Sequence, residues 1–176
     1  MKRIAFFLLL SSITIFSCKK DSKNDGGTGG GGGGSTTPKA ASGTFIIDGT
    51  VYTPGTIQAK PEGEEYIIQG LASNGGVGFL QVRLGGGKPE NSGTYPLEAS
   101  KPTSGSFEPT SEGKSSIYTW GTNDGGMAWS TDATTGNTIV TVDDNKITVV
   151  INDAVIKRGL EDQSHTVSVN FTAEME

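Results

Sequence analysis

Histidine and cysteine, two side chains often used in acid–base and nucleophilic catalysis, are scarce in this chain of 176 residues. The chain has one histidine, His165, and one cysteine, Cys18. A serine–histidine–acid triad would have to use His165, but that residue opens a regularly alternating segment, and the sequence has no nucleophile-elbow motif. A structural zinc site needs four Cys or His ligands, which these two residues cannot supply. We therefore expect His165 to be an exposed residue at a strand end, and we expect the protein not to be an enzyme.

Carboxylates are plentiful in residues 43–176, which hold 17 Asp and Glu against 8 Lys and Arg. With His165 neutral, the formal charge of this region is −9, and nucleic-acid binding, which needs a basic surface, is disfavoured. Asp143-Asp144-Asn145, Asn152-Asp153 and Asn123-Asp124 could offer oxygen ligands to calcium, although none matches the twelve-residue calcium-loop pattern. Turn residues that bond their own backbone explain these clusters better, so no cofactor is expected. Two carboxylates could also serve a secreted glycoside hydrolase, but no motif singles out a pair.

Aromatic residues give the clearest binding pattern. Trp120 and Trp129 flank a glycine-rich turn, and Tyr118 lies two residues before Trp120 on the same face of an expected strand. If residues 116–121 and 127–131 pair as a hairpin, the two tryptophans come near each other across it. An exposed aromatic row can stack on sugar rings, so Tyr118, Trp120 and Trp129 are the candidate residues of a glycan-binding platform. The alternative, which we favour, is that these large side chains fill the core.

The first residues of the chain are typical of a secretion signal. Lys2 and Arg3 precede an apolar run from Ile4 to Phe16. Thirteen residues reach about 20 Å as a helix, which is short of the roughly 30 Å hydrocarbon core of a membrane. A positive start and a short apolar stretch before small residues indicate a cleaved signal instead. The run ends in Ile15-Phe16-Ser17-Cys18.

This ending resembles the lipobox of bacterial lipoproteins, and its continuation through Lys19-Lys20-Asp21 resembles those of Bacteroidetes-type bacteria. Phe16 is bulkier than the strictest lipobox pattern allows. The resemblance implies that residues 1–17 are removed, that the Cys18 sulfur carries a diacylglyceryl thioether, and that the new amine is acylated. Two or more acyl chains would hold the protein firmly on a membrane. The alternative is an ordinary cleaved signal followed by a chance cysteine.

The charges after Cys18 bear on which membrane face the protein occupies. Residues 19–25 hold three positive and two negative charges, which is a poor match to the acidic surface-export signal of some Bacteroidetes lipoproteins. The resemblance therefore implies the outer membrane, with the periplasmic side favoured over the cell surface.

Residues 18–42 are expected to form a flexible tether. Eight of the nine residues from 26 to 34 are glycine. The root-mean-square span of such a linker grows as about 5–6 Å times the square root of its length, or about 27 Å for residues 19–42. A phosphate-binding loop is the alternative for the glycines, but it needs a strand before it and a helix after it. The sequence predicts neither.

Residues 43–176 are expected to form a single all-β domain. Branched residues are abundant, and residues 166–175 alternate apolar and polar side chains, the pattern of a half-buried strand. Pairs such as Asp48-Gly49 supply the tight turns between strands. We predict an antiparallel β-sandwich, or a partly open barrel, of about 8–10 short strands, with a long surface loop over residues 100–116. The expected strands are 44–52, 56–60, 65–73, 77–84, 93–98, 116–121, 127–131, 138–143, 146–156 and 165–175.

The domain resembles a broad group of small Bacteroidetes-type lipoproteins of unknown function. The resemblance rests on an opening strand at 43–49, the segment Gly93-Thr94-Tyr95-Pro96-Leu97, and closing strands at 146–156 and 165–173. The group has no agreed activity, so the resemblance implies no catalytic residues. Our first hypothesis is a non-catalytic lipoprotein of the cell envelope, held on the membrane by Cys18, that binds an unknown protein or glycan partner or has a structural role. The alternatives are a carbohydrate-binding module and, far behind, a hydrolase.

Overall fold

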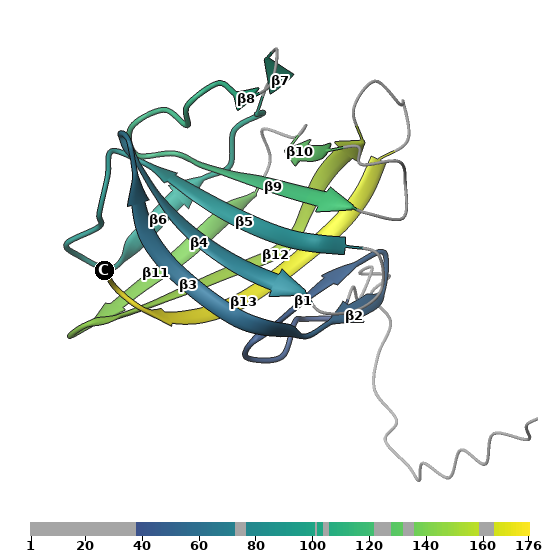
Figure 1. The fold of residues 1–176 in the computed structure, drawn as a ribbon, viewed down its shortest axis with the longest axis horizontal. Coiled ribbons are helices and arrows are strands. Elements are labelled where there is room, and N and C mark those ends of the chain that lie inside the picture. Colours follow the sequence, from purple (N-terminus) through teal and green to yellow (C-terminus); the bar gives the residue numbers. More distant parts are fainter. Residues whose placement is uncertain are drawn as a thin grey trace, which may run out of the picture. The chain divides into compact units, whose positions relative to one another are not determined.

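The computed structural model describes residues 38–72, 77–100, 102–103, 106–121, 128–131, 136–158 and 164–176 (Figure 1). These residues form strands and turns, with no helix among them. In particular, the described part contains no helix that is long and apolar enough to cross a membrane. The predicted signal, Cys18 and most of the predicted tether lie outside the described residues.

Strands follow one another with short connections, as the turn residues predict. Their bounds are β1 Thr44–Ile47, β2 Thr50–Tyr52, β3 Pro54–Glu62, β4 Glu65–Ala72, β5 Val77–Gly85, β6 Gly93–Pro96, β7 Pro102–Thr103, β8 Ser106–Phe107, β9 Ser115–Gly121, β10 Ala128–Thr131, β11 Asn137–Asp143, β12 Lys146–Arg158 and β13 Ser164–Glu174.

The strands form an antiparallel β-sandwich. Neighbouring strands follow the order β2-β1-β13-β12-β10-β9-β5-β4-β3, while β11 pairs with both β12 and β6, and β7 pairs with β8. Figure 1 shows β3, β4, β5 and β9 lying across β11, β12 and β13 as a second layer. At the far edge, Ala59 of β3 forms an isolated bridge with Met175, the residue that follows β13. The sheet thus folds over itself without closing into a barrel, and the predicted all-β sandwich is confirmed.

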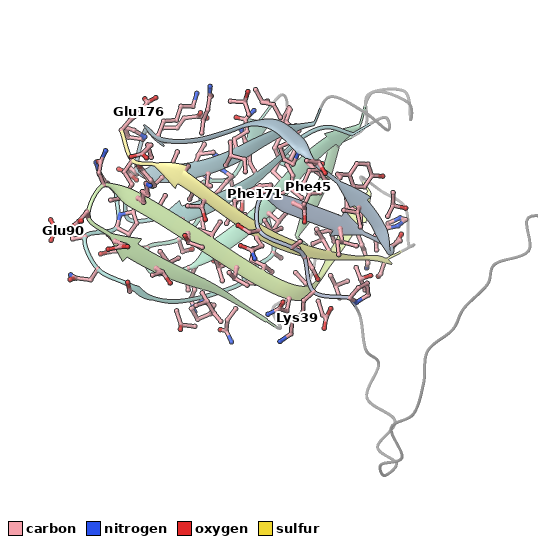
Figure 2. All side chains as sticks on the ribbon, turned by 90° about the horizontal axis from the view of Figure 1, so that it is seen from below. Lys39, Phe45, Glu90, Phe171 and Glu176 are labelled. Atoms are coloured by element: carbon pink, nitrogen blue, oxygen red, sulfur yellow. The ribbon has the colours of Figure 1, made fainter. Side chains whose placement is uncertain are left out.

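Apolar side chains from both layers fill the space between them. The predicted alternation of β13 is confirmed, because Val167, Val169, Phe171 and Ala173 are all buried. Phe171 meets the Phe45 ring edge-on, with 6.0 Å between the ring centroids, and Figure 2 shows the two rings together inside the domain. Removing such apolar surface from water is the main stabilising contribution to a fold of this kind.

Two sequence expectations need correction. The segment 44–52 is not one strand: it is the β1–β2 hairpin, which turns at Asp48 and Gly49, both at positive φ (48° and 80°). The predicted loop over 100–116 is not simply a surface loop either. Ser100 and Thr110 are buried, and Ser115 already belongs to β9.

Gly85 explains why residues 108–114 lie so close to the sheet. A Cβ atom on this residue would lie only 2.0 Å from the Ser111 carbonyl oxygen and 2.4 Å from that of Thr110. The bare glycine therefore lets the backbone of this segment pack directly on β5. The Gly85 N–H donates to the Lys114 carbonyl at 3.0 Å, and the Gly113 N–H donates back to the Gly85 carbonyl at 3.2 Å.

The contacts of the domain begin slightly before residue 43. Ala40 is buried, with 9% of its surface exposed, and its carbonyl accepts a bond of 3.3 Å from the Asn170 side-chain amide. The Gly43 N–H donates to the Asn170 carbonyl at 2.8 Å. These bonds attach the residues before β1 to the side of β13.

Candidate functional site

The outer face of β3, β4, β5 and β9 carries a row of side chains that we call the outer row: Gln58, Gln69, Gln81 and Tyr118. Each residue is the direct register partner of the next, so the row crosses four neighbouring strands. Three of the chain's four glutamines belong to it. Because register partners share one face of a sheet, these residues are brought together although they are distant in the sequence.

Strand alternation places the outer row on the face away from the core. On β9, the residues on either side of Tyr118 are buried: Ile117 is 0% exposed and Thr119 is 1% exposed. Tyr118 itself is half-buried and lies outside the core cluster. Within the row, the Gln81 Nε2 atom donates to the Gln69 Oε1 atom at 3.1 Å, which holds the two amides in one orientation.

Apolar side chains flank the outer row on one side. The Phe79 ring meets the Tyr118 ring edge-on, with 5.4 Å between the centroids and 62° between the ring planes. Leu71, the register partner of Phe79 on β4, is 37% exposed. Partial burial raises the pKa of the Tyr118 phenol, while the charge of Arg83 acts in the opposite direction. The outer face therefore combines apolar and aromatic surface with amides.

The structure brings the candidate strands of the predicted platform together. β9 and β10 pair as the expected hairpin, with Trp120 opposite Ala128 and Trp129 opposite Thr119. The two tryptophans therefore occupy register positions one residue apart. Trp129 pairs with the buried Thr119, whereas Tyr118 and Trp120 hold the alternate positions of β9, so the register does not set the three predicted platform residues in one row. Their side chains lie outside the described part of the structure, as does the lipidation candidate Cys18. Tyr118 is the predicted platform residue whose surroundings are described.

A covered ion pair borders the outer row on the side opposite Phe79. The Arg83 Nε atom donates to Glu65 Oε1 at 3.2 Å, and a second guanidinium nitrogen binds Glu65 Oε2. The Thr110 backbone N–H donates to Glu65 Oε1 at 2.7 Å, and the Thr110 hydroxyl lies 2.8 Å from that of Ser116. Burial acts to raise the pKa of Glu65, but the bonds from Arg83 and Thr110 outweigh it and lower that pKa. The carboxylate stays charged as a structural anchor for residues 108–114.

His165 is bound to an acid that the sequence did not single out. Its Nδ1 atom lies 2.5 Å from Asp48 Oδ2, and its side chain is 12% exposed. The expectation that His165 is exposed is therefore wrong: the β1–β2 turn places the Asp48 carboxylate against the Nδ1 atom of the ring. Asp48 also accepts the Thr166 N–H at 2.9 Å. Partial burial would raise the pKa of Asp48, but these bonds lower it.

The acidic clusters that could have suggested calcium lie at turns and irregularities. Asp144 adopts a φ of 51° in the turn between β11 and β12, and Asp153 adopts a φ of 55° where the β12–β13 register shifts. Asn123-Asp124 lies outside the described residues. Across the described ranges, no three His, Cys, Asp or Glu side chains gather where they could hold a metal ion.

Sequence reasoning found Tyr118 but missed the glutamines that continue its row. Hairpin pairing of 56–60, 65–73 and 77–84, worked out residue by residue from the turns, would have been the signal to find them. Comparison of the chain with protein-family models, curated proteins and solved structures found no match. The chain's own residues therefore carry the functional proposal.

Proposed function

We propose that this protein is a lipid-anchored component of the outer membrane whose β-sandwich domain binds a partner without catalysis. The observation that supports binding most strongly is the outer row, an uncharged strip on a domain with a formal charge of −9. Exposed apolar and aromatic surface that is not needed for the core often marks a binding surface. The lipobox-like Ile15-Phe16-Ser17-Cys18 and the glycine-rich segment after it support the anchor and the tether.

The contacts of two titratable groups in the described part of the chain fit a structural role. A general acid or base needs a group that can reach the substrate and exchange a proton with it. His165 is held by Asp48, and the Glu65 carboxylate is held by Arg83 and the Thr110 backbone. A structural role explains both sets of contacts.

Replacing Cys18 with Ala tests the anchor. We expect the variant to lose incorporation of labelled fatty acid and to accumulate as an unprocessed precursor, because acylation needs the cysteine sulfur. Ser17→Ala is the control, since a small residue before the cut site is retained and labelling should continue. Fatty-acid labelling, membrane fractionation and gel mobility measure the outcome. Normal processing and membrane association of Cys18→Ala would contradict the lipoprotein proposal.

Carbohydrate binding is the second candidate, and Tyr118 favours it. The ring is half-buried on the outer face, outside the core cluster, and is held edge-on by Phe79. A ring fixed in this way can present its apolar surface and its hydroxyl to a ligand at little cost in side-chain entropy. Native gels that contain a polysaccharide retard a protein that binds it. In a gel whose polysaccharide retards the unaltered protein, Tyr118→Ala should be retarded less. Retardation equal to that of the unaltered protein would remove Tyr118 from the site.

A further inference from the structure

We propose that the outer row binds an extended, uncharged polysaccharide that lies across the strands, with one sugar unit over each of β3, β4, β5 and β9. This inference rests on the carbohydrate-binding candidate above and adds the class of ligand, its direction and three further binding residues, Gln58, Gln69 and Gln81.

The chemistry of the row fits sugar hydroxyls. A glutamine amide offers two N–H donors and a carbonyl acceptor, and a hydroxyl can both donate and accept. The bond between Gln81 and Gln69 uses one donor and one acceptor, so each amide keeps capacity for a ligand while its orientation is fixed. The Phe79–Tyr118 pair and Leu71 beside the row supply apolar surface for the C–H faces of the rings.

The spacing of the row fits a chain of sugar rings. Neighbouring strands lie about 4.8 Å apart, which is close to the length of one pyranose unit in an extended polysaccharide. Because the row takes one residue from each strand, its repeat follows that spacing. Four positions span about 14 Å, so a chain lying across the strands presents a new ring to each side chain.

The charge distribution selects an uncharged ligand. The four residues of the row and the flanking Leu71 and Phe79 are all uncharged, in a region with a formal charge of −9. An acidic polysaccharide would be repelled by the domain as a whole. Two cations of the described residues flank the row on this face: Arg83, two residues from Gln81, is bound to Glu65, and Lys60, two residues from Gln58, lies 3.9 Å from the Glu62 carboxylate. A neutral glycan is not repelled by the acidic domain and needs no cation to bind it.

Binding by the full-length protein in detergent tests the proposal. Native gels containing hydroxyethylcellulose, xyloglucan, galactomannan or starch, and gels containing alginate or polygalacturonate, separate neutral from acidic ligands. Oligosaccharides of one to six units from the retarding polymer are then titrated by calorimetry. We expect at least one neutral polymer to retard the protein, no retardation by the acidic ones, and affinity that rises with length to about four units and then levels off.

Substitutions in the row test which residues are used. Gln69→Ala and Gln81→Ala should each weaken binding by roughly 3- to 10-fold, the usual effect of losing an uncharged hydrogen bond. Asn152→Ala is the matched control, because it removes an exposed amide from β12 in the other layer. Thermal melting of each variant verifies its fold, so that loss of binding is not confused with unfolding.

Three outcomes would overturn the inference. They are the absence of retardation by every neutral polymer, retardation by the acidic ones instead, and glutamine variants that bind like the unaltered protein. Concentration-dependent dimerisation that Gln81→Ala abolishes would assign the face to a second copy of the chain. None of these results touches the anchor, which the fatty-acid labelling of Cys18→Ala decides separately.

Discussion

Glu65 and Arg83 form an ion pair that positions the surrounding backbone more than it stabilises the fold. The Glu65 side chain is 4% exposed and that of Arg83 is 12% exposed. Removing charges from water costs nearly as much as their attraction returns, so a buried pair adds little net stability, whereas removing one partner is costly. The pair also fixes the Thr110 backbone, and so it connects β4, β5 and the segment that covers them.

Glu65→Gln should therefore destabilise the domain by about 3 kcal/mol at neutral pH, because the Arg83 charge is left buried without its partner. Since the pKa of Glu65 is lowered in the folded state, this contribution is present above the ordinary glutamate pKa of about 4.3 and is lost as the pH falls through the folded-state value. The difference between the two proteins should shrink in acid. Urea denaturation over a pH series measures it.

The double variant Glu65→Leu with Arg83→Met separates the two effects. With both charges removed, we expect a smaller loss of stability than in Glu65→Gln alone. A double variant that is less stable than the single one would mean that the pair itself stabilises the fold.

At the scale of elements, Gly85 controls how residues 108–114 pack on β5. Gly85→Ala should destabilise the domain by roughly 2–4 kcal/mol, because the new methyl group would overlap backbone carbonyl oxygens that cannot move independently. Amide hydrogen exchange should show lost protection at Gly113 and Lys114. The Gly113 N–H donates to the Gly85 carbonyl, and the Lys114 carbonyl accepts the Gly85 N–H.

Gly55→Ala is the matched control for that substitution. A Cβ there meets nothing within 4 Å, and its φ lies outside the left-handed range, so alanine should be neutral or slightly stabilising. Equal losses of stability in the two variants would show that the close approach at Gly85 is not what matters.

Strands were predictable to the extent that period-two patterns and turn residues specify them. β12 follows its alternating sequence as far as Ile151, where its register with β13 shifts, and the turn at Asp144 joins β11 to β12 as its residue types predict. The packing of residues 108–114 over Gly85 was not predictable, because a segment rich in Ser, Thr and Pro has no hydrophobic pattern that indicates where it packs. The pairing of β10 with β12 was also beyond the sequence, since nothing local encodes which distant strands become neighbours.

At the scale of the whole molecule, the boundary of the folded unit can be tested by truncation. A chain beginning at Pro38 should match the stability of the full chain, because the described contacts begin at Ala40. A chain beginning at Thr44 should lose about 1–2 kcal/mol, since it lacks the bonds that Ala40 and Gly43 make with Asn170. Thermal and urea denaturation compare the three, and equal stability of both truncated chains would place the boundary after Gly43.

The candidate site was only partly predictable at this scale. Tyr118 stood out because aromatic residues are few and tend to be used for packing or binding. Gln58, Gln69 and Gln81 did not stand out, because a glutamine has no periodic or motif signal of its own. They become a row only when three hairpins set the register across the layer.

The position of β1 decides how the domain would respond to force. In a protein anchored as we propose, tension from the membrane enters at Ala40 and Gly43, which are bonded to Asn170, and passes into β1, a strand held on both sides by β13 and β2. Beyond the end of β1, Asp48 adds side-chain bonds to His165 and Thr166. The domain would then behave as a stiff load-bearing body that holds its ligand face intact while the anchor is pulled.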